Sequence, residues 1–98
     1  MKTTMNKEAD KLTVKVEGRL DTLTAPEFDD EIKPALDGIT ELVLDLDALE
    51  YISSAGLRSL LGITQTMEKQ GKMYVTNVSD EVMDIFDLTG FKSILEFK

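Results

Sequence analysis

The sequence predicts a single α/β domain with a mixed central sheet of about five strands and three main helices. Its 98 residues suffice for one hydrophobic core but not for a second. Hydrophobic residues make up 42% of the chain, and their regular patterning argues against intrinsic disorder. Segments with strand period and segments with helical period alternate in the order β-β-α-β-α-β-α-β, which is typical of a compact α/β domain across residues 1–98.

Two strands are expected at the start of the chain. Residues 1–6 form a short first strand, and the polar residues 7–10 form a turn. Three apolar residues then alternate with polar ones, the period of a half-buried strand: Leu12, Val14 and Val16. Gly18 interrupts this strand near its end, where we expect a bulge or a close backbone approach.

The first helix is expected to begin after Thr24. Pro26 is tolerated in a first turn, and Glu27 stands three residues after Thr24, the spacing of a capping box. Pro34 removes one backbone hydrogen bond, so the helix bends there or has an irregular last turn before it closes at Asp37 and Gly38. Apolar residues recur at helical spacing and predict the core-facing stripe: Phe28, Ile32, Ala35 and Leu36.

The second half of the chain predicts a buried strand, a long helix and two more strands. Residues 42–46 are almost continuously apolar, as expected of a central strand covered on both faces. Residues 54–69 form the second helix, which stops at Gly71. Residues 73–77 form the next strand, and residues 94–97 complete the sheet.

The third helix carries clear start and stop signals. Ser79 is expected to cap it, and the acidic residues Asp80 and Glu81 suit the positive end of its dipole. Gly90 ends it, with Phe91 able to fold back on the last turn. The predicted inward stripe contains Val82, Ile85, Phe86 and Thr89.

Composition excludes several classes of partner. The net charge is −8, and no window concentrates the basic residues that nucleic acid or an anionic membrane surface requires. No apolar run approaches the roughly 20 residues of a membrane helix, so direct membrane insertion is not expected. The first residues lack the apolar stretch of a signal peptide, and there is no cysteine, so we expect a cytoplasmic location.

The chain lacks the residues of the common catalytic sites. Without histidine it builds neither a Ser-His-Asp triad nor a histidine metal site. No Ser-x-x-Lys spacing surrounds Ser53 or Ser54, and neither glycine-rich nucleotide motif occurs. Asp45 and Asp47 have no third metal ligand and are more typical of strand-end polar residues. We therefore expect no enzyme activity, no metal and no cofactor.

The most informative segment is the turn at residues 53–57, where an apolar strand gives way to a helix. If Ser54 caps that helix, its oxygen accepts a hydrogen bond from the amide of Gly56 or Leu57. A phosphate there meets free amides and the positive end of the helix dipole. The residues alone leave two interpretations open, a phosphorylated serine in a switch and an ordinary helix cap.

Charge arithmetic indicates how such a switch would act. A phosphate adds about −1.5 to −2 charges to a chain that already carries −8, so long-range attraction to a partner changes little. Burying an unpaired dianion in an interface costs several kcal/mol. A phosphate would therefore act by local clash and desolvation.

The chain resembles STAS domains, the bacterial anti-sigma factor antagonists and their relatives. The resemblance runs in order over nearly the whole chain, and the serine turn is its most specific part. Its motifs are residues 18–21 (GRLD), 24–25 (TA), 42–46 (LVLDL), 51–57 (YISSAGL) and 86–90 (FDLTG).

The resemblance implies a partner-switching module. An unmodified antagonist binds an anti-sigma factor, often a serine kinase; phosphorylation of the turn serine releases it, and a PP2C-type phosphatase reverses the modification. Ser54 matches the phosphoacceptor, and Asp21 matches an acidic residue that lies close to it. Ser53 is the alternative acceptor, because phosphorylated relatives often carry aspartate at its place.

The expected partner contacts follow from the same resemblance and from neighbouring residues. Arg58 stands just inside the helix start, and Met83 lies off the inward stripe of the third helix, exposed near the switch. The expected set is Asp21, Ser53, Ser54, Ala55, Gly56, Leu57, Arg58 and Met83. An alternative function is that of a STAS accessory subunit in a membrane complex, such as a lipid-transport ATPase.

Overall fold

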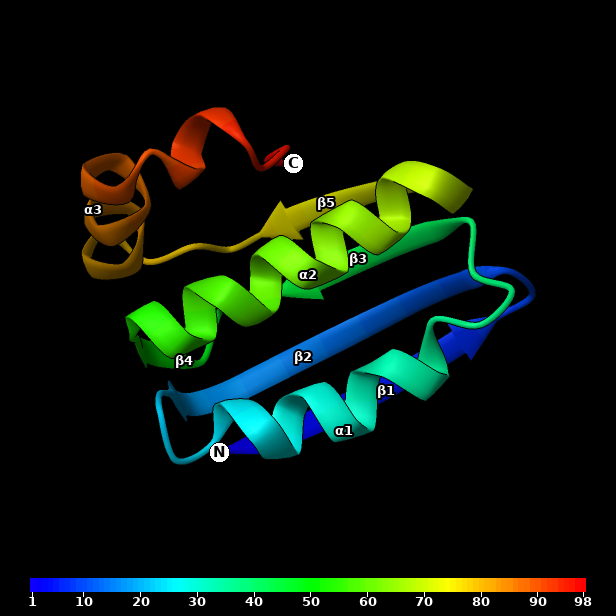
Figure 1. The fold of residues 1–98 in the computed structure, drawn as a ribbon, viewed down its shortest axis with the longest axis horizontal. Coiled ribbons are helices and arrows are strands. Elements are labelled where there is room, and N and C mark those ends of the chain that lie inside the picture. The colour runs from blue at the N-terminus through cyan, green and yellow to red at the C-terminus, as the bar shows by residue number, and fades with distance from the viewer.

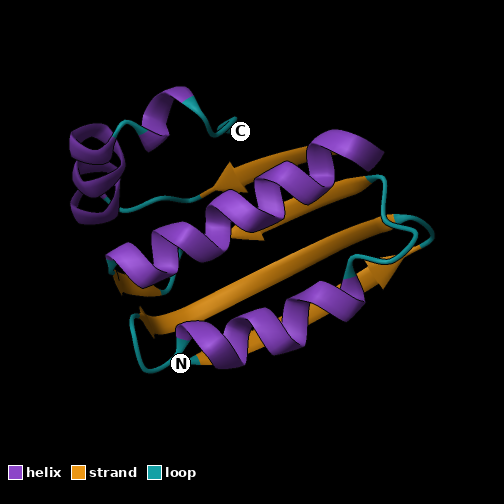
Figure 2. Cartoon of the chain, viewed as in Figure 1, coloured by secondary structure: helices purple, strands orange, loops and turns teal.

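A computed structural model describes residues 1–98 as a five-stranded sheet with two long helices packed on one face and a third helix at one end (Figure 1). This confirms the predicted fold class, which Figure 2 shows by element type. The elements are β1 (Lys2–Glu8), β2 (Lys11–Leu20), α1 (Ala25–Ala35), β3 (Glu41–Asp45), β4 (Leu49–Ile52), α2 (Ser54–Gln70), β5 (Lys72–Thr76), α3 (Asp80–Thr89) and a 3-10 turn at Phe91–Ser93.

The long strand β2 organises the sheet. Strands run in the order β1-β2-β3-β5, with β1 antiparallel to β2 and the other neighbours parallel. The first half of β2 pairs with β3, and its last residues pair in parallel with β4. The register shifts between Gly18 and Arg19, and Gly18 has a φ of 93°, which confirms the irregularity expected there.

The core lies between the sheet and the helices α1 and α2. Phe28 and Ile32 of α1 and Leu60 of α2 are almost completely buried against the strands. Along β3, Leu42 and Leu44 are fully buried, whereas Val43 and Asp45 are only half-buried. The prediction that this strand is covered on both faces was therefore wrong. Both long helices pack on the same face of the sheet, and the opposite face is left open (Figure 1).

The fifth strand is not the one that the sequence predicted. Residues 94–97 contribute only an isolated bridge between Phe97 and Val75, so they do not complete the sheet as a strand. Strand β4 is instead the fifth strand, and it was not predicted from the sequence. Its residues are buried only at the two ends, Leu49 and Ile52, so it lacks the alternation that marks a half-buried strand.

The first helix does not begin with the predicted capping box. Thr24 has helical backbone angles, and its side chain accepts no hydrogen bond from the first turn. Its Oγ1 instead accepts from the Asp21 amide at 2.9 Å and donates to the Arg19 carbonyl at 2.8 Å. Pro34 lies within the last turn, and the helix ends one residue later at Ala35.

The third helix largely follows its sequence signals. Ser79 Oγ accepts from the Val82 amide at 3.2 Å, and Gly90 has a φ of 82°, so both predicted caps are confirmed. The Phe91 ring stacks on Phe86, as expected. Thr89 is exposed, however, so its assignment to the inward stripe was wrong. Its hydroxyl donates to the Ile85 carbonyl at 2.7 Å, which satisfies it without burial.

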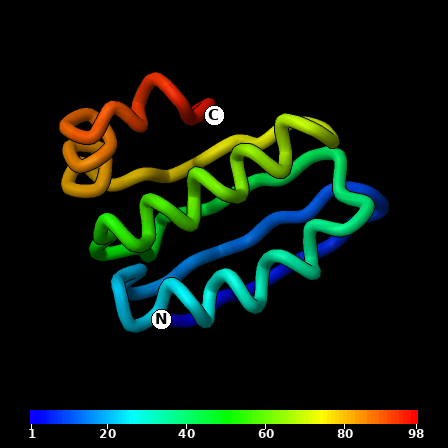
Figure 3. Tube along the Cα trace, in the orientation of Figure 1, coloured from blue at the N-terminus to red at the C-terminus, as the bar shows by residue number.

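The chain path places two connections at the same end of the sheet (Figure 3). Strands β2 and β4 are parallel and pair at their last residues, so the segments that follow them leave the sheet together. The first segment, residues 21–24, leads into α1, and the second, Ser53, leads into α2. This juxtaposition assembles the candidate site.

Candidate phosphorylation and partner-binding site

The serine turn is anchored to the end of β2. Ile52 of β4 pairs with Leu20 of β2, and the Ser53 amide donates to the Leu20 carbonyl oxygen at 2.9 Å. Leu20 and Ile52 are both almost completely buried. The start of α2 is therefore fixed by backbone pairing on one side and by the core on the other.

Ser53, not Ser54, caps α2. Ser53 has an extended backbone with φ −95° and ψ 177°, and its Oγ accepts from the Gly56 amide at 3.4 Å. Its carbonyl accepts the first helical hydrogen bond, from the Leu57 amide at 2.9 Å. These are the features of an N-cap residue, so the prediction that Ser54 caps was wrong. Ser54 is the first residue inside the helix, and its side chain forms no hydrogen bond with the first-turn amides.

Ser54 is the free serine of the turn. It is the first helical residue, it is exposed, and its hydroxyl forms no hydrogen bond with the protein. Because Leu57 donates the first helical bond, the amides of Ser54 and Ala55 have no partner within the helix. The first turn contains no acidic residue. A phosphate on Ser54 would therefore break no contact of the fold.

Gly56 and Leu57 have packing roles beneath this serine. A Cβ at Gly56 would lie 2.6 Å from the Leu20 carbonyl oxygen and 2.7 Å from the Ile52 side chain. Leu57 is only 6% exposed and belongs to the hydrophobic core. Both residues were expected to contact a partner, but the structure buries them. They position the exposed Ser54 rather than present a surface of their own.

Asp21 shapes the neighbouring loop. Its Oδ1 accepts from the amides of Leu23 at 3.0 Å and Thr24 at 3.1 Å, and its Oδ2 lies 3.7 Å from Arg19 Nε. The hydrogen bonds from Thr24, with help from Leu23 and Arg19, hold the pKa of the Asp21 carboxyl below its usual range. The carboxylate therefore organises residues 21–24, a role that sequence analysis missed although the Asp-x-x-Thr spacing signals such a turn.

Two side chains of this end were also missed. Leu23 is 88% exposed on the loop that Asp21 organises. The sequence signal for an exposed apolar side chain was a leucine that stands between two threonines in a predicted loop. Tyr51 is 38% exposed, and the Arg19 guanidinium lies over its ring, 4.5 Å from the ring centroid. This cation–π contact links β4 to the end of β2.

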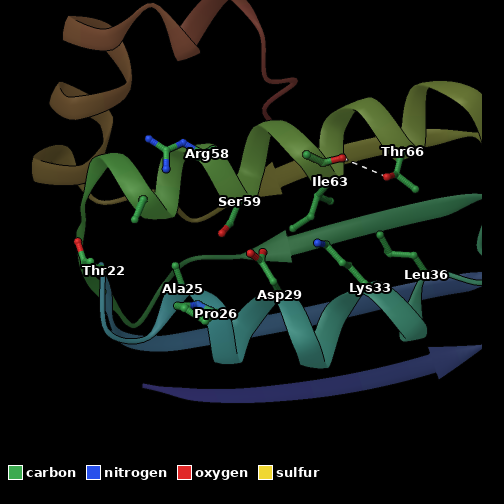
Figure 4. A pocket seen from close by; sticks show the side chains of 12 residues that line it. Thr22, Ala25, Pro26, Asp29, Lys33, Leu36, Arg58, Ser59, Ile63 and Thr66 are labelled. Atoms are coloured by element: carbon green, nitrogen blue, oxygen red, sulfur yellow. Dashed lines mark hydrogen bonds between the residues drawn. The ribbon is translucent and has the colours of Figure 1, made fainter.

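A groove of about 490 Å³ runs between α1 and α2 from the serine turn (Figure 4). Ala55 and Arg58 belong to its lining near the start of α2. Farther along, Asp29 and Lys33 of α1 point toward α2, from which Ser59 points back. The sequence assigned no site to this groove, because its two walls come from segments far apart in the chain.

The family model described as STAS domain matches residues 2–98. The chain belongs to the STAS domain family. This confirms the resemblance inferred from the sequence motifs.

Individual relatives of this STAS domain are regulatory proteins. The anti-sigma-B factor antagonist of Staphylococcus aureus is 32% identical over 84 residues, a match that covers 84% of this chain and 78% of the relative. An anti-sigma factor antagonist from Mycobacterium paratuberculosis, 26% identical, superposes with a TM-score of 0.88 over 98% of this chain and 83% of that chain.

A more distant structure shares the fold of this STAS domain. The anti-sigma factor antagonist SpoIIAA, from Bacillus, has been solved in unphosphorylated and phosphorylated forms, with TM-scores of 0.77 and 0.76 and identities of 16% and 17%. Both matches cover 99% of this chain, with 87% and 91% of the respective SpoIIAA chains. At these identities the likeness concerns the fold alone.

Met83 differs from its expected place in the STAS domain. Met83 was predicted to lie on the surface near the switch, but it is half-buried and packs against the hydrophobic core. Met83 is half-buried although it lies off the inward stripe, because α3 lies over the end of the sheet and contacts β4.

Neither α2 nor any other helix combines the length and apolar character needed to cross a membrane.

Proposed function

We propose that this STAS domain is an anti-sigma factor antagonist that binds an anti-sigma factor serine kinase and releases it when Ser54 is phosphorylated. The family membership and the antagonists among its relatives support the general role. The observation that carries the switch is the contrast between the two serines. Ser54 is exposed with an uncommitted hydroxyl, whereas Ser53 is half-buried and caps α2.

This contrast favours Ser54 over Ser53 as the acceptor. A kinase must reach the hydroxyl oxygen, and Ser54 offers it without loss of any intramolecular contact. Phosphorylation of Ser53 would disturb the oxygen that accepts from the Gly56 amide. Loss of such a cap costs about 1 kcal/mol. The capping role of Ser53 is also compatible with the aspartate that the family resemblance implies at this position, because aspartate caps a helix as well as serine does.

Release follows from where the phosphate lies. Ser54 stands at the end of the sheet where exposed Leu23 and Tyr51 also lie, and we propose that the partner binds at this end. A dianion buried there against a partner surface that offers it no cation costs several kcal/mol. Each 1.4 kcal/mol is about tenfold in affinity, so one phosphate suffices to dissociate the complex. The exposure of Ser54 also suits removal of the phosphate by a PP2C-type phosphatase.

Identification of the phosphorylated residue tests this proposal. The chain is incubated with its cognate anti-sigma factor kinase and magnesium ATP, and the phosphate is located by mass spectrometry. Ser54→Ala should abolish labelling. Ser53→Asn keeps a capping side chain but removes the hydroxyl, so this variant should be labelled like the unaltered chain.

Two outcomes would overturn the proposal. Labelling that persists in Ser54→Ala and disappears in Ser53→Asn would move the acceptor to Ser53. A chain that neither binds nor is labelled by the kinase would favour the alternative of an accessory subunit in a membrane transport complex.

A further inference from the structure

We propose that Arg58 binds the phosphate of phosphorylated Ser54 within the same helix. The inference deepens the proposed function, on which it rests for the identity of the modified residue. It assigns to Arg58 a role inside the phosphorylated chain, in addition to any contact that it makes with a partner.

The spacing places the two residues on one face of α2. Ser54 is the first residue of the helix, and Arg58 follows four residues later. Side chains at this spacing are neighbours on a helix surface. Both residues are exposed. Figure 4 shows Arg58 rising from α2 while Ser59, one residue farther on, points toward α1.

Arg58 forms no ion pair, although Asp29 of α1 lines the same groove. The ion pairs of the chain join Lys11 to Glu41 and Arg19 to Asp21, and neither includes Arg58. The helix positions three and four residues away on either side hold no acid: Ser54, Ala55, Leu61 and Gly62. The guanidinium is therefore available to an anion that appears at residue 54.

The chemistry of the pair is favourable. A guanidinium presents a planar set of donors that matches phosphate oxygens in a bidentate fashion. An acidic group N-terminal to a basic one at this spacing is the better orientation on a helix. Phosphorylation would thus add an anion to the surface and at the same time occupy a cation on it. Both changes alter what a partner meets at the start of α2.

The test measures the second pKa of the phosphate by phosphorus NMR in full-length chains that carry phosphoserine genetically encoded at residue 54. This pKa is near 6 for an unpaired phosphoserine, and a nearby arginine lowers it because it favours the dianion. Arg58→Gln should raise the measured pKa by roughly 0.2–0.4 unit, the size expected of a helix pair at this spacing. Arg58→Lys should restore part of that shift.

Lys69→Gln is the matched control, because it removes one positive charge from the last turn of the same helix. It should leave the phosphate pKa unchanged. A pKa that is the same with and without Arg58, or that rises equally in Lys69→Gln, would overturn the inference. The encoded phosphoserine requires no kinase, so a failure of the kinase to label Ser54 would refute the proposed function and leave this result standing.

Discussion

Gly56 lies so close to Leu20 that a Cβ on the glycine would stand 2.6 Å from the Leu20 carbonyl oxygen. The same carbonyl accepts the Ser53 amide at 2.9 Å. The Leu20 carbonyl oxygen thus holds the capping residue of α2 and also lies in close contact with the first turn of that helix. The exposed Ser54 lies between these two contacts along the chain.

Gly56→Ala should therefore destabilise the fold. The added methyl would meet the Leu20 carbonyl and the Ile52 side chain, and overpacking of this kind costs about 1–3 kcal/mol. Urea unfolding measures the change. Gly62→Ala in the same helix is the control, because a Cβ there meets nothing within 4 Å and should stabilise by roughly 0.5–1 kcal/mol. Equal effects at the two glycines would contradict the close approach at Gly56.

The two serines should differ in their contribution to stability. Ser53→Ala removes the side chain that caps α2 and should lower the free energy of unfolding by about 1 kcal/mol. Ser53→Asn should retain most of it. Ser54→Ala should change it by less than roughly 0.5 kcal/mol, because its hydroxyl makes no contact. Chemical denaturation of the three variants checks the assignment, and a larger loss in Ser54→Ala than in Ser53→Ala would reverse it.

A negative charge at residue 54 should act on binding and not on folding. Ser54→Asp should weaken the complex with the anti-sigma factor kinase by about tenfold or more, whereas Ser54→Asn, similar in size but neutral, should weaken it less. Calorimetry gives the affinities, and thermal melts of the free chains give the stabilities. If Ser54→Asp melted far lower than Ser54→Asn while both bound equally well, the serine would be structural.

The charge of Asp21 should contribute to stability in a defined pH range. Its pKa in the folded chain lies below the ordinary value of 3.8, chiefly because of the hydrogen bonds from Thr24. A depressed folded pKa gives stability that is present above the unfolded pKa and lost as pH falls through the folded one. Asp21→Asn keeps an acceptor oxygen but not the charge. The stability difference between the two chains should be present at pH 7 and shrink below about pH 4.

Urea unfolding at several pH values between 7 and 2.5 measures this difference. Glu27→Gln, an exposed acid of the neighbouring first turn of α1, serves as a control for general charge effects. An Asp21→Asn difference that does not change with pH would show that the charge of Asp21 adds nothing to the loop.

Local signals in the sequence sufficed for much of the fold. The alternation in β2, the spacing of Phe28 and Ile32 in α1, and the caps of α3 at Ser79 and Gly90 each depend on neighbours a few residues away. Family motifs indicated the serine turn. These features were predictable because helix period, strand period and capping chemistry are properties of short segments.

Other features depend on parts of the chain that are distant in sequence. Strand β4 lacks the alternation of a strand in its own sequence. It forms because Ile52 pairs with Leu20 of β2 and both side chains are buried in the core. The open face of the sheet results from the packing of both long helices on the other face.

The sequence by itself determined that a serine pair opens the central helix of a STAS domain, because the motif and its glycine are local. Only the tertiary structure decided which serine is free. The end of β2 holds the Ser53 backbone extended, which directs its oxygen to the Gly56 amide and leaves Ser54 exposed on the first turn. That choice depends on a hydrogen bond between residues 20 and 53, and no local pattern encodes such a contact.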